Sequence, residues 1–406
     1  MQRRSLSGQL QQSEIPLPRI PTKILLLYWG SGKERCRMNI ILIFVTTSVA
    51  AWALLFLLFP VASHTGLLDA PCARKRHRGN VPLIGGLAIA ISLLSVWLYY
   101  FEWNLTLLSL VIASLLMVST GVLDDRFDLS VRLRIIMQLL AASIIVVGGG
   151  IEINSLGNLF GLGEIELGAF SGVFTVLAIM TAMNAYNMVD GIDGLLGGLS
   201  LVAFMGITAL AWLTGMAVPF VFAVSFVFAL IPFLVRNLQS HDSKLQKVFM
   251  GDAGSMFIGL SIVWLLALLT NPALNESFYL RSRLVFDFVE IQTIRPVAVL
   301  WLITIPLMDM LGIMVRRVSK GQNPFKPDRN HLHHIFMRAG FSSREALLII
   351  VGSATWWMLV GLWLEIQQTP ERFVLLTYFV VFGIYLLCLK YTWRLVTWVR
   401  RIRGIT

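Results

Sequence analysis

Long apolar stretches, each bounded by polar or charged residues, recur along the whole chain. Each stretch has roughly 18 to 22 residues, the length that an α-helix needs to cross the hydrocarbon layer of a bilayer. Helices are expected because backbone groups in lipid must be hydrogen-bonded within their own segment. The pattern therefore predicts an all-α, polytopic membrane protein with about eleven transmembrane helices, at approximately 39–60, 83–101, 105–123, 131–150, 168–188, 194–213, 217–234, 253–270, 296–315, 345–364 and 372–390.

The composition agrees with a membrane setting. Of the 406 residues, 57% are hydrophobic and only 14% are charged, whereas roughly a quarter of the residues in soluble domains are charged. The formal charge of +11 does not indicate nucleic-acid binding, because Lys and Arg fall in short clusters between the apolar stretches, as at a membrane surface. The three cysteines have no metal-type spacing and cannot all pair, so neither a disulfide framework nor a zinc site is predicted.

The basic clusters also predict how the helices are oriented. They concentrate in the odd-numbered loops and the C-terminal tail, and such loops stay in the cytoplasm. With eleven helices, the C-terminus is then cytoplasmic and the N-terminus lies on the far side. Residues 1–37 are basic and lack the apolar core of a signal peptide. We expect 1–37 to be an extension that is disordered or not translated, and 38–406 to form a single transmembrane domain.

Acidic and imidazole side chains divide unevenly between the two sides. Nearly all aspartates and all six histidines fall in the predicted cytoplasmic loops or at the cytoplasmic helix ends, whereas most glutamates fall on the other side. Solvated loops alone do not predict such a division. One polar reaction site on the cytoplasmic face does.

The third span runs into the first acidic motif, Asp-Asp-Arg-Phe-Asp from Asp124 to Asp128. If the helix continues through it, Asp124 and Asp128 share a face, with Asp125 beside them. Carboxylates that repel one another at a membrane surface usually persist because a cation or a proton transfer holds them there. A solvated helix end is the alternative. Arg132 and Arg134 follow within two turns and suit either a phosphate or membrane anchoring.

A second motif lies at the cytoplasmic end of the fifth span. Asn184, Asn187 and Asp190 recur every three residues and line one side of a helix, and Asp193 follows among glycines that permit a tight turn. Carboxylate and amide oxygens suit a hard cation such as Mg²⁺. Because polar groups beside hydrocarbon are costly, we favour a metal-binding role over a purely structural one.

The eighth span opens with a third motif, Phe-Met-Gly-Asp-Ala-Gly-Ser from Phe249 to Ser255. A helix N-terminus attracts anions through its unpaired N–H groups and its dipole, and small residues let an anion approach the backbone. Asp252 is also a suitable N-cap, and Phe249 suits either stacking on a base or anchoring at the interface. The motif alone leaves these alternatives open.

The ninth loop is the most basic and contains Arg329 and the sequence His331-Leu-His333-His334. A zinc site would need more ligands at suitable spacing, whereas cationic and imidazole donors on one loop suit the oxygens of a diphosphate. In a helix, His331 and His334 would align with Arg338.

Two further observations bear on the reaction that these motifs could catalyse. Asp309, near the cytoplasmic end of the ninth span, is expected to partner the histidine loop. The sequence has no Gly-x-x-x-x-Gly-Lys-Ser/Thr loop and no Gly-x-Gly-x-x-Gly fingerprint, so ATP-driven chemistry is not expected. Metal-assisted phosphoryl transfer remains, with carboxylates and amides for Mg²⁺ and cations for oxyanions.

In their order along the chain, these motifs resemble those of polyprenyl-phosphate N-acetylhexosamine-1-phosphate transferases. The His-Leu-His-His form is similar to the branch that uses UDP-N-acetylglucosamine and starts O-antigen and enterobacterial common antigen synthesis, whereas the peptidoglycan branch usually has three consecutive histidines. The likeness runs from residue 69 to about 340 and rests on Arg74-Lys75-Arg76-His77 with Pro82 to Gly86, on Asp124-Asp125, on Asn184 to Gly194, on Phe249 to Ser255, and on Pro324 to His334.

The resemblance implies a role for each motif. Arg134 stands where relatives often have Lys, and because a guanidinium is a poor proton shuttle only phosphate contact is expected of it. The implied roles are catalysis for Asp124, Asp125 and Asp193, with Asp124 the better base; metal binding for Asn187, Asp190 and Asp252; donor binding for Phe249, Arg329, His331, His333 and His334; lipid-phosphate binding for Arg76, Arg132 and Arg134; and support for Asn184, Asn237 and Asp309.

The resemblance also implies partners and a location. The substrates would be UDP-N-acetylglucosamine and undecaprenyl phosphate, the cofactor Mg²⁺ or alternatively Mn²⁺, and the setting the bilayer of a bacterial inner membrane, with a periplasmic N-terminus and an active site facing the cytoplasm. No nucleic acid is expected, and a homodimer is left open. Another UDP-N-acetylhexosamine is an alternative donor. A membrane transporter is a less favoured reading, because transporters place their sites near the bilayer midplane.

Overall fold

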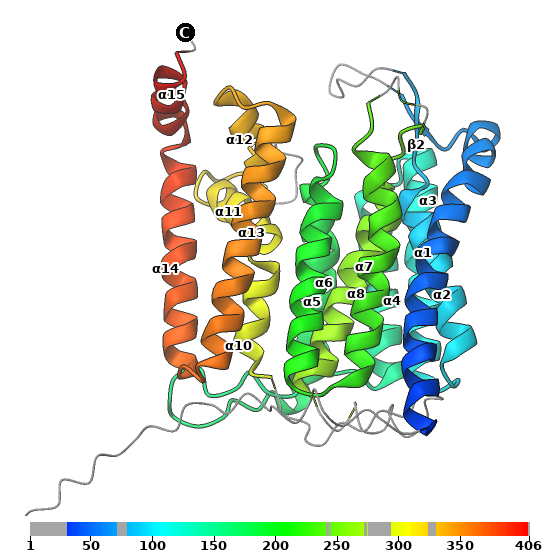
Figure 1. Cartoon of the computed structure of the whole chain (residues 1–406). Helices are drawn as coiled ribbons and strands as arrows, with labels where there is room; N and C mark the ends of the chain where they lie inside the picture. The colour runs from blue at the N-terminus through cyan, green and yellow to red at the C-terminus, as the bar shows by residue number, and fades with distance from the viewer. Residues whose placement is uncertain are drawn as a thin grey trace, which may run out of the picture.

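Upright helices side by side make up the structure (Figure 1). It is a computed structural model that describes residues 31–70, 79–240, 243, 245–271, 274, 294–323 and 330–404, with side chains from residue 41 onward. The sheet found in these residues has two short antiparallel strands, β1 (Leu68–Asp69) and β2 (Val81–Pro82). The predicted all-α class is confirmed.

The helices follow the predicted spans closely. Among the described residues, ten helices are long and apolar enough to cross a membrane, as a multi-pass membrane protein requires. The helical segments are α1 (Ser31–Thr65), α2 (Gly85–Tyr100), α3 (Leu105–Phe127), α4 (Val131–Ser143), η2 (Ile144–Gly148), η3 (Gly168–Phe170), α5 (Ser171–Val189), α6 (Leu195–Leu213), α7 (Ala217–Asn237), α8 (Gly251–Thr270), α10 (Pro296–Val299), η4 (Leu300–Ile303), α11 (Thr304–Val318), α12 (Leu332–Arg338), α13 (Ser343–Ile366), α14 (Glu371–Lys390) and α15 (Thr392–Ile402).

The predicted span at 83–101 corresponds to α2, which has only 16 residues. At 1.5 Å per residue it is about 24 Å long, short of the roughly 30 Å hydrocarbon layer. Its first residues are also tied to another segment, because the N–H groups of Gly85 and Gly86 donate to the carbonyls of Phe249 and Met250 at 2.8 and 2.9 Å. Ten of the eleven predicted spans are therefore confirmed by length, and the eleventh is a shorter apolar helix.

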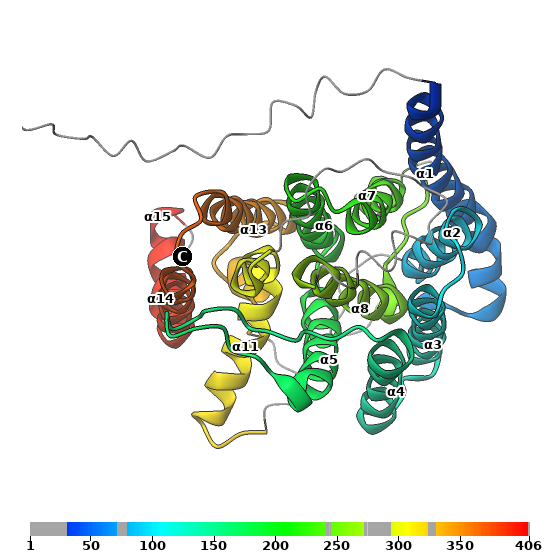
Figure 2. The ribbon, with the colours of Figure 1, turned by 90° about the horizontal axis from the view of Figure 1, so that it is seen from below.

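Helix α8 lies at the centre of the bundle (Figure 2), and 94% of its most apolar window is buried. Glycines let its neighbours come close. A Cβ added to Gly86 of α2 would lie 2.2 Å from the Cα of Gly254, and one added to Gly121 of α3 would lie 2.3 Å from the Cα of Ala253. Backbones approach this closely only where small residues meet. The contacts fix the first turn of α8 against both α2 and α3.

The loops with the predicted site residues gather at one end of the bundle. Strand β2, α12, α15 and the C-terminus lie at the top of Figure 1, and α1 begins at the bottom, as an odd number of spans requires. The assignment of the top end to the cytoplasm stays a prediction from the basic loops. Residues 31–37 of the predicted extension belong to α1, and 1–30 lie outside the described residues. Whether translation starts at Met38 stays a prediction.

A long connection, residues 151–167, crosses the opposite end of the bundle from η2 and reaches α14 (Figure 2). It folds back on itself, because the N–H of Leu156 donates to Ile165 O and the N–H of Ile165 donates to Gly157 O, both at 3.0 Å. Leu159 packs against a small apolar core of α10, η4, α11, α13 and α14. The connection thus joins the two sides of the bundle.

We predict that Gly121→Val destabilises the protein, because the added side chain would overlap α8. Overpacking of this kind costs about 1–3 kcal/mol or more. The measurement is the thermal unfolding midpoint of purified protein in detergent. The control is Gly352→Val in α13, where an added Cβ meets no atom within 4 Å. Equal midpoints for the two variants would contradict the close contact between α3 and α8.

Candidate active site

A carboxylate from α3 caps the first turn of α8. The N–H of Asp252 donates to both oxygens of Asp125 at 3.0 Å. Met250, the residue before the helix, provides no side-chain acceptor, so Asp125 satisfies an N–H that would otherwise be unpaired and lies at the positive end of the helix dipole. Gly251 has a φ of +73°, and a Cβ there would lie 2.4 Å from Asp125 Oδ2. Glycine is needed for both reasons.

Asp252 is not the N-cap that the sequence left open, because it is the second residue of α8. Its Oδ1 accepts from Asn187 Nδ2 at 2.7 Å, and the same amide donates to Ser255 Oγ at 3.0 Å. Asn187 lies in the last turn of α5. The structure therefore brings together the amide of the second motif and the carboxylate of the third, two of the predicted metal ligands.

Arg134, in the first turn of α4, joins this cluster to the first motif. Its Nη1 donates to Asp124 Oδ2 at 2.9 Å and lies 3.7 Å from Asp252 Oδ2. Asp124 is 5% exposed, and its Oδ1 also accepts from the N–H of Leu129 at 2.8 Å. Two carboxylates, those of Asp124 and Asp252, are thus close to one guanidinium, and that of Asp125 accepts from the backbone of Asp252. The resemblance implied phosphate contact for Arg134, and here the same group pairs with acids.

The acidic motif does not continue as a helix, which corrects one expectation. Helix α3 ends at Phe127, and Asp128 adopts a left-handed conformation with φ of 52°. Asp124 and Asp128 therefore do not share a helical face. Arg132 is exposed and forms no salt bridge with another described residue, so the structure does not bring it into the cluster.

A lysine that no sequence pattern indicated lies beside Asp193 and Phe249, for which catalysis and donor binding were expected. Lys247 Nζ forms a salt bridge with Asp193 Oδ2 and lies 5.4 Å from the centroid of the Phe249 ring, within the range of a cation–π contact. The one sequence signal was its position two residues before Phe249. Asp190 is exposed at the end of α5.

Two asparagines hold the polypeptide around the site. Asn237 Oδ1 accepts from Gly194 N at 2.6 Å, and its Nδ2 donates to Val248 O at 2.8 Å, so it joins two of the motif loops. Asn184 Nδ2 donates to Gln138 Oε1 of α4 at 2.9 Å. The described contacts fit the supporting roles that were expected.

Buried Asp309 of α11 holds the histidine segment. Its Oδ2 lies 2.9 Å from His331 Nδ1, and its Oδ1 accepts from Leu332 N at 3.0 Å and from Tyr385 Oη of α14 at 2.8 Å. Asp309 and His331 are 2% and 6% exposed, so these bonds are shielded from water. The expected partnership between Asp309 and this loop is present, and Tyr385, which no sequence pattern indicated, completes it. Because His331 precedes α12, the predicted helical alignment applies only from His334 to Arg338.

His333 lies against the second motif. A Cβ on Gly191 would lie 2.1 Å from His333 Nε2, and this nitrogen is buried with no hydrogen-bond partner among the described residues. The rings of His331 and His333 are nearly parallel at 6.1 Å, and that of His334 lies 4.1 Å from His333. Burial, with a smaller contribution from His334, lowers the pKa of His333 from 6.5 to about 3. His333 is therefore a neutral imidazole at physiological pH.

Two predicted site residues, Arg76 and Arg329, lie outside the described residues. Within the described ranges, no group of three or more His, Cys, Asp or Glu side chains could hold a metal ion. A metal here would need ligands from elsewhere, such as substrate phosphates, as is usual for Mg²⁺.

Comparison with known proteins identifies the family to which this chain belongs. The model of glycosyl transferase family 4 matches residues 107–270, which include Asp124, Asn187 and Asp252. Three proteins called undecaprenyl-phosphate alpha-N-acetylglucosaminyl 1-phosphate transferase are similar over most of their length. The one from Escherichia coli (strain K12) is 37% identical over 360 residues, covering 88% of this chain and 93% of the relative. The chain belongs to this family of glycosyl-1-phosphate transferases.

The other two relatives agree. The one from Salmonella typhimurium is 37% identical over 367 residues, covering 90% of this chain and 94% of the relative, and the one from Haemophilus influenzae is 38% identical over 363 residues, covering 89% and 97%. The resemblance stated from the motifs is confirmed, and the transferase is a multi-pass membrane enzyme. Its acidic cluster and its histidine segment converge at one end of the bundle.

We predict graded losses of stability in the transferase when the Asp309 network is cut. Tyr385→Phe removes one hydrogen bond and should cost about 1 kcal/mol, whereas Asp309→Ala leaves several buried donors unpaired and should cost about 3 kcal/mol or more. Thermal unfolding in detergent measures both, with Tyr99→Phe as control because Tyr99 is 72% exposed. Equal stability of Asp309→Ala and wild type would refute the network.

His333 should make stability depend on pH. The unfolded chain binds a proton near pH 6.5, while folded His333 stays neutral down to about pH 3, so the free energy of unfolding falls as the pH drops below 6.5. The slope attributable to this residue approaches about 1.4 kcal/mol per pH unit. Unfolding midpoints between pH 7 and 5 should therefore fall less steeply in His333→Gln than in wild type. Exposed His64 is the control, and the slope of His64→Gln should match wild type.

Proposed function

We propose that this enzyme transfers N-acetylglucosamine 1-phosphate from UDP-N-acetylglucosamine to undecaprenyl phosphate. The products would be undecaprenyl-diphosphate-N-acetylglucosamine and UMP, and the step would be the first membrane step of O-antigen or enterobacterial common antigen synthesis. The observation that supports it most is the convergence of Asp125, Asp252 and Asn187 with the Asp124–Arg134 pair at one bundle end. The names of the relatives support the acceptor and the sugar.

The reaction exchanges one phosphoanhydride for another. An oxygen of the lipid phosphate forms a bond to the β-phosphorus of the donor, and the bond from that phosphorus to the bridging oxygen of UMP breaks. Because similar bonds form and break, the equilibrium should lie near balance, and added UMP should drive the reaction backward. The main task of the protein is to hold two anionic phosphates together.

The donor set fits Mg²⁺, with Mn²⁺ as an alternative. Asp124 and Asp252 lie beside one guanidinium, that of Arg134, and Asp125 adds a third carboxylate at the N–H of Asp252, so another cation is electrostatically favourable. Asp252 and Asn187 would hold it, with Asp190 nearby in sequence and substrate phosphate completing the ligands. When bound, Mg²⁺ neutralises charge on the converging phosphates.

The residues on α3 and α4 would receive the lipid phosphate. Asp124 is the candidate base, because its carboxylate lies 2.9 Å from Arg134, the residue that would contact the lipid phosphate. Arg134 can exchange a carboxylate for a phosphate oxygen, since its planar fork suits both. Asp125 would hold α8 in place and so orient Asp252.

The opposite side of the site would bind the donor. Lys247 and Phe249, linked to Asp193, offer a cation and an aromatic face to the uridine monophosphate part. A carboxylate accepts hydrogen bonds, so His331 donates to Asp309 through Nδ1. Its Nε2 would donate to a diphosphate oxygen when this nitrogen also carries a proton. His333 and His334 stand beside it, and Arg329 is expected there as well.

The site would face the cytoplasm from a bacterial inner membrane, and the basic loops at the same end support the cytoplasmic side. The transporter reading loses support, because the polar cluster lies at the ends of α3, α5 and α8 rather than midway along broken helices.

The test uses purified enzyme in detergent with undecaprenyl phosphate and a panel of UDP-sugars labelled in the sugar. Label from UDP-N-acetylglucosamine should enter a solvent-extractable lipid, with one UMP released per product. Chelation of divalent cations should stop transfer, and Mg²⁺ or Mn²⁺ should restore it. Label from only another UDP-N-acetylhexosamine would refute the donor, and no lipid label from any donor would refute the proposed reaction.

In the same assay, Asp252→Asn should lower turnover by about 10²-fold or more, because the charge next to Asn187 is lost while the side chain keeps its size. Its unfolding midpoint should stay near wild type. Glu166→Gln makes the same chemical change at an exposed position of the opposite end and should leave turnover unchanged. Near-normal turnover of Asp252→Asn would remove Asp252 from the proposed metal site.

A further inference from the structure

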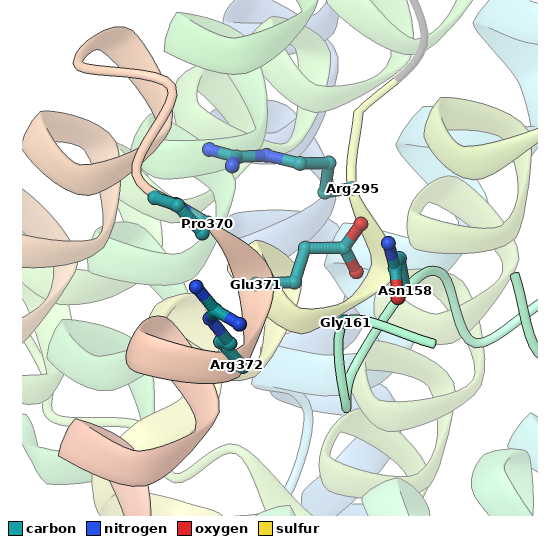
Figure 3. Close-up of a pocket in the computed structure, with 6 residues that line it drawn as sticks. All are labelled: Asn158, Gly161, Arg295, Pro370, Glu371 and Arg372. Atoms are coloured by element: carbon teal, nitrogen blue, oxygen red, sulfur yellow. The ribbon is translucent and has the colours of Figure 1, made fainter. Parts of the chain in front are cut away.

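A cavity of about 340 Å³ lies at the end of the bundle opposite the active site. The turn of the 151–167 connection and the start of α14 form its walls (Figure 3). Charged and amide side chains from three segments face one another there. The lining residues are Asn158, Gly161, Arg295, Pro370, Glu371 and Arg372.

One of the charges in this cavity is already neutralised. Arg295 pairs with buried Glu365, with Nη2 at 2.8 Å from Oε2 and Nε donating to the same oxygen at 2.9 Å. Its remaining N–H groups donate to the carbonyls of Leu364 and Thr369. Arg295 therefore shapes the wall of the cavity and has little donor capacity left for a ligand.

Among the described residues, the other two charges have no partner of opposite sign. Glu371 Oε2 is buried and has no hydrogen-bond partner among the described residues, although a buried carboxylate oxygen normally accepts a hydrogen bond. The guanidinium of Arg372 lies over the Phe373 ring at 4.9 Å and forms no salt bridge within the described part of the chain. Asn158 Oδ1 accepts from Gly163 N at 3.0 Å, which leaves its amide N–H groups for a ligand.

The backbone at Gly157 packs closely against the Glu371 carboxylate. Gly157 has a φ of +78°, and a Cβ there would lie 2.1 Å from Glu371 Oε2. Only glycine allows both the turn and the contact. On the other side, a Cβ on Gly161 would lie 3.2 Å from Arg372 Nη1. The two glycines thus let the turn close over an acid and a base that do not pair with each other.

We propose that this cavity binds the head group of a zwitterionic phospholipid with a primary ammonium, of the phosphatidylethanolamine class. Its ammonium would donate to the Glu371 carboxylate, and its phosphate would accept from Arg372 and Asn158. The charges of the cavity that pair with no other described residue are one acid and one base, so a zwitterion balances both, whereas an anion leaves Glu371 unpaired.

The position of the cavity favours a lipid over a soluble zwitterion. Glu371 and Arg372 are the first two residues of the membrane-spanning helix α14, so they lie where hydrocarbon gives way to head groups. Apolar side chains on the same helix stay uncovered by the protein, and acyl chains can lie along them; examples are Phe373, Leu376, Phe379 and Val380. This site does not depend on the reaction proposed above.

The experiment measures lipid binding to the detergent-purified full-length enzyme by native mass spectrometry. Dioleoyl phosphatidylethanolamine, phosphatidylcholine and phosphatidylglycerol are titrated separately. We expect phosphatidylethanolamine to bind about tenfold more tightly than the other two, because only its head group has a cationic N–H donor that can pair with Glu371. Glu371→Gln should abolish the preference over phosphatidylcholine. Arg372→Gln should weaken the binding of phosphatidylethanolamine and of phosphatidylcholine. Arg372→Lys should bind these two lipids nearly as tightly as wild type.

Controls separate a specific site from general effects. Glu164→Gln and Arg394→Gln make the same changes at exposed positions outside the cavity and should leave the preference intact. Unfolding midpoints identify any variant that fails to fold, in which case Asn158→Ala replaces it, with weaker binding of both lipids expected. Equal binding of the three lipids to wild type, or an unchanged preference in Glu371→Gln, would overturn the proposal. Competition by free phosphoethanolamine at the same concentration as the lipid would overturn the assignment to a lipid.

Discussion

The architecture of the site depends on the contact between the Asp125 carboxylate and the N-terminus of α8. That helix is the most buried of the bundle, and its first turn has N–H groups that no residue of its own segment satisfies. Asp125 satisfies them from α3, across a glycine that leaves no space for any other side chain. Asp252 follows directly and is thereby aimed at Asn187. A charge that is costly near lipid is thus stabilised by a helix end that itself needs an acceptor.

The same geometry explains why the motifs are far apart in sequence and still act together. Each lies where a helix begins or ends at the same end of the bundle, and the glycine contacts of α2 and α3 with α8 set how closely those ends approach. Asn237 then connects the turn at Gly194 with the backbone at Val248. The positions of the candidate site residues are determined here by backbone proximity more than by long, adaptable side chains.

Much of this was predictable from the sequence because it follows from local pattern. Apolar length predicted the helices, and the spacing of Asn184 and Asn187 predicted a polar helix side. Asp190 was wrongly placed on that side, because α5 ends at Val189. Contacts between distant segments were not predictable in the same way. No local feature of Tyr385 distinguishes it from an interfacial tyrosine, and Lys247 sits in a basic loop where any lysine is expected. The helix end at Phe127 was missed because Asp128 can adopt a left-handed conformation that few other residues tolerate.

The hydrogen bond from Tyr385 to Asp309 joins the histidine segment to helix α14. Helix α14 is the least buried of the long helices, at 17% of its most apolar window, so lipid surrounds most of it. Helices adjust to bilayer thickness mainly by tilting. A tilt of α14 would act on Tyr385 and, through one buried carboxylate, on His331. Two hydrogen bonds thus join the histidine segment to the long helix that the rest of the bundle covers least.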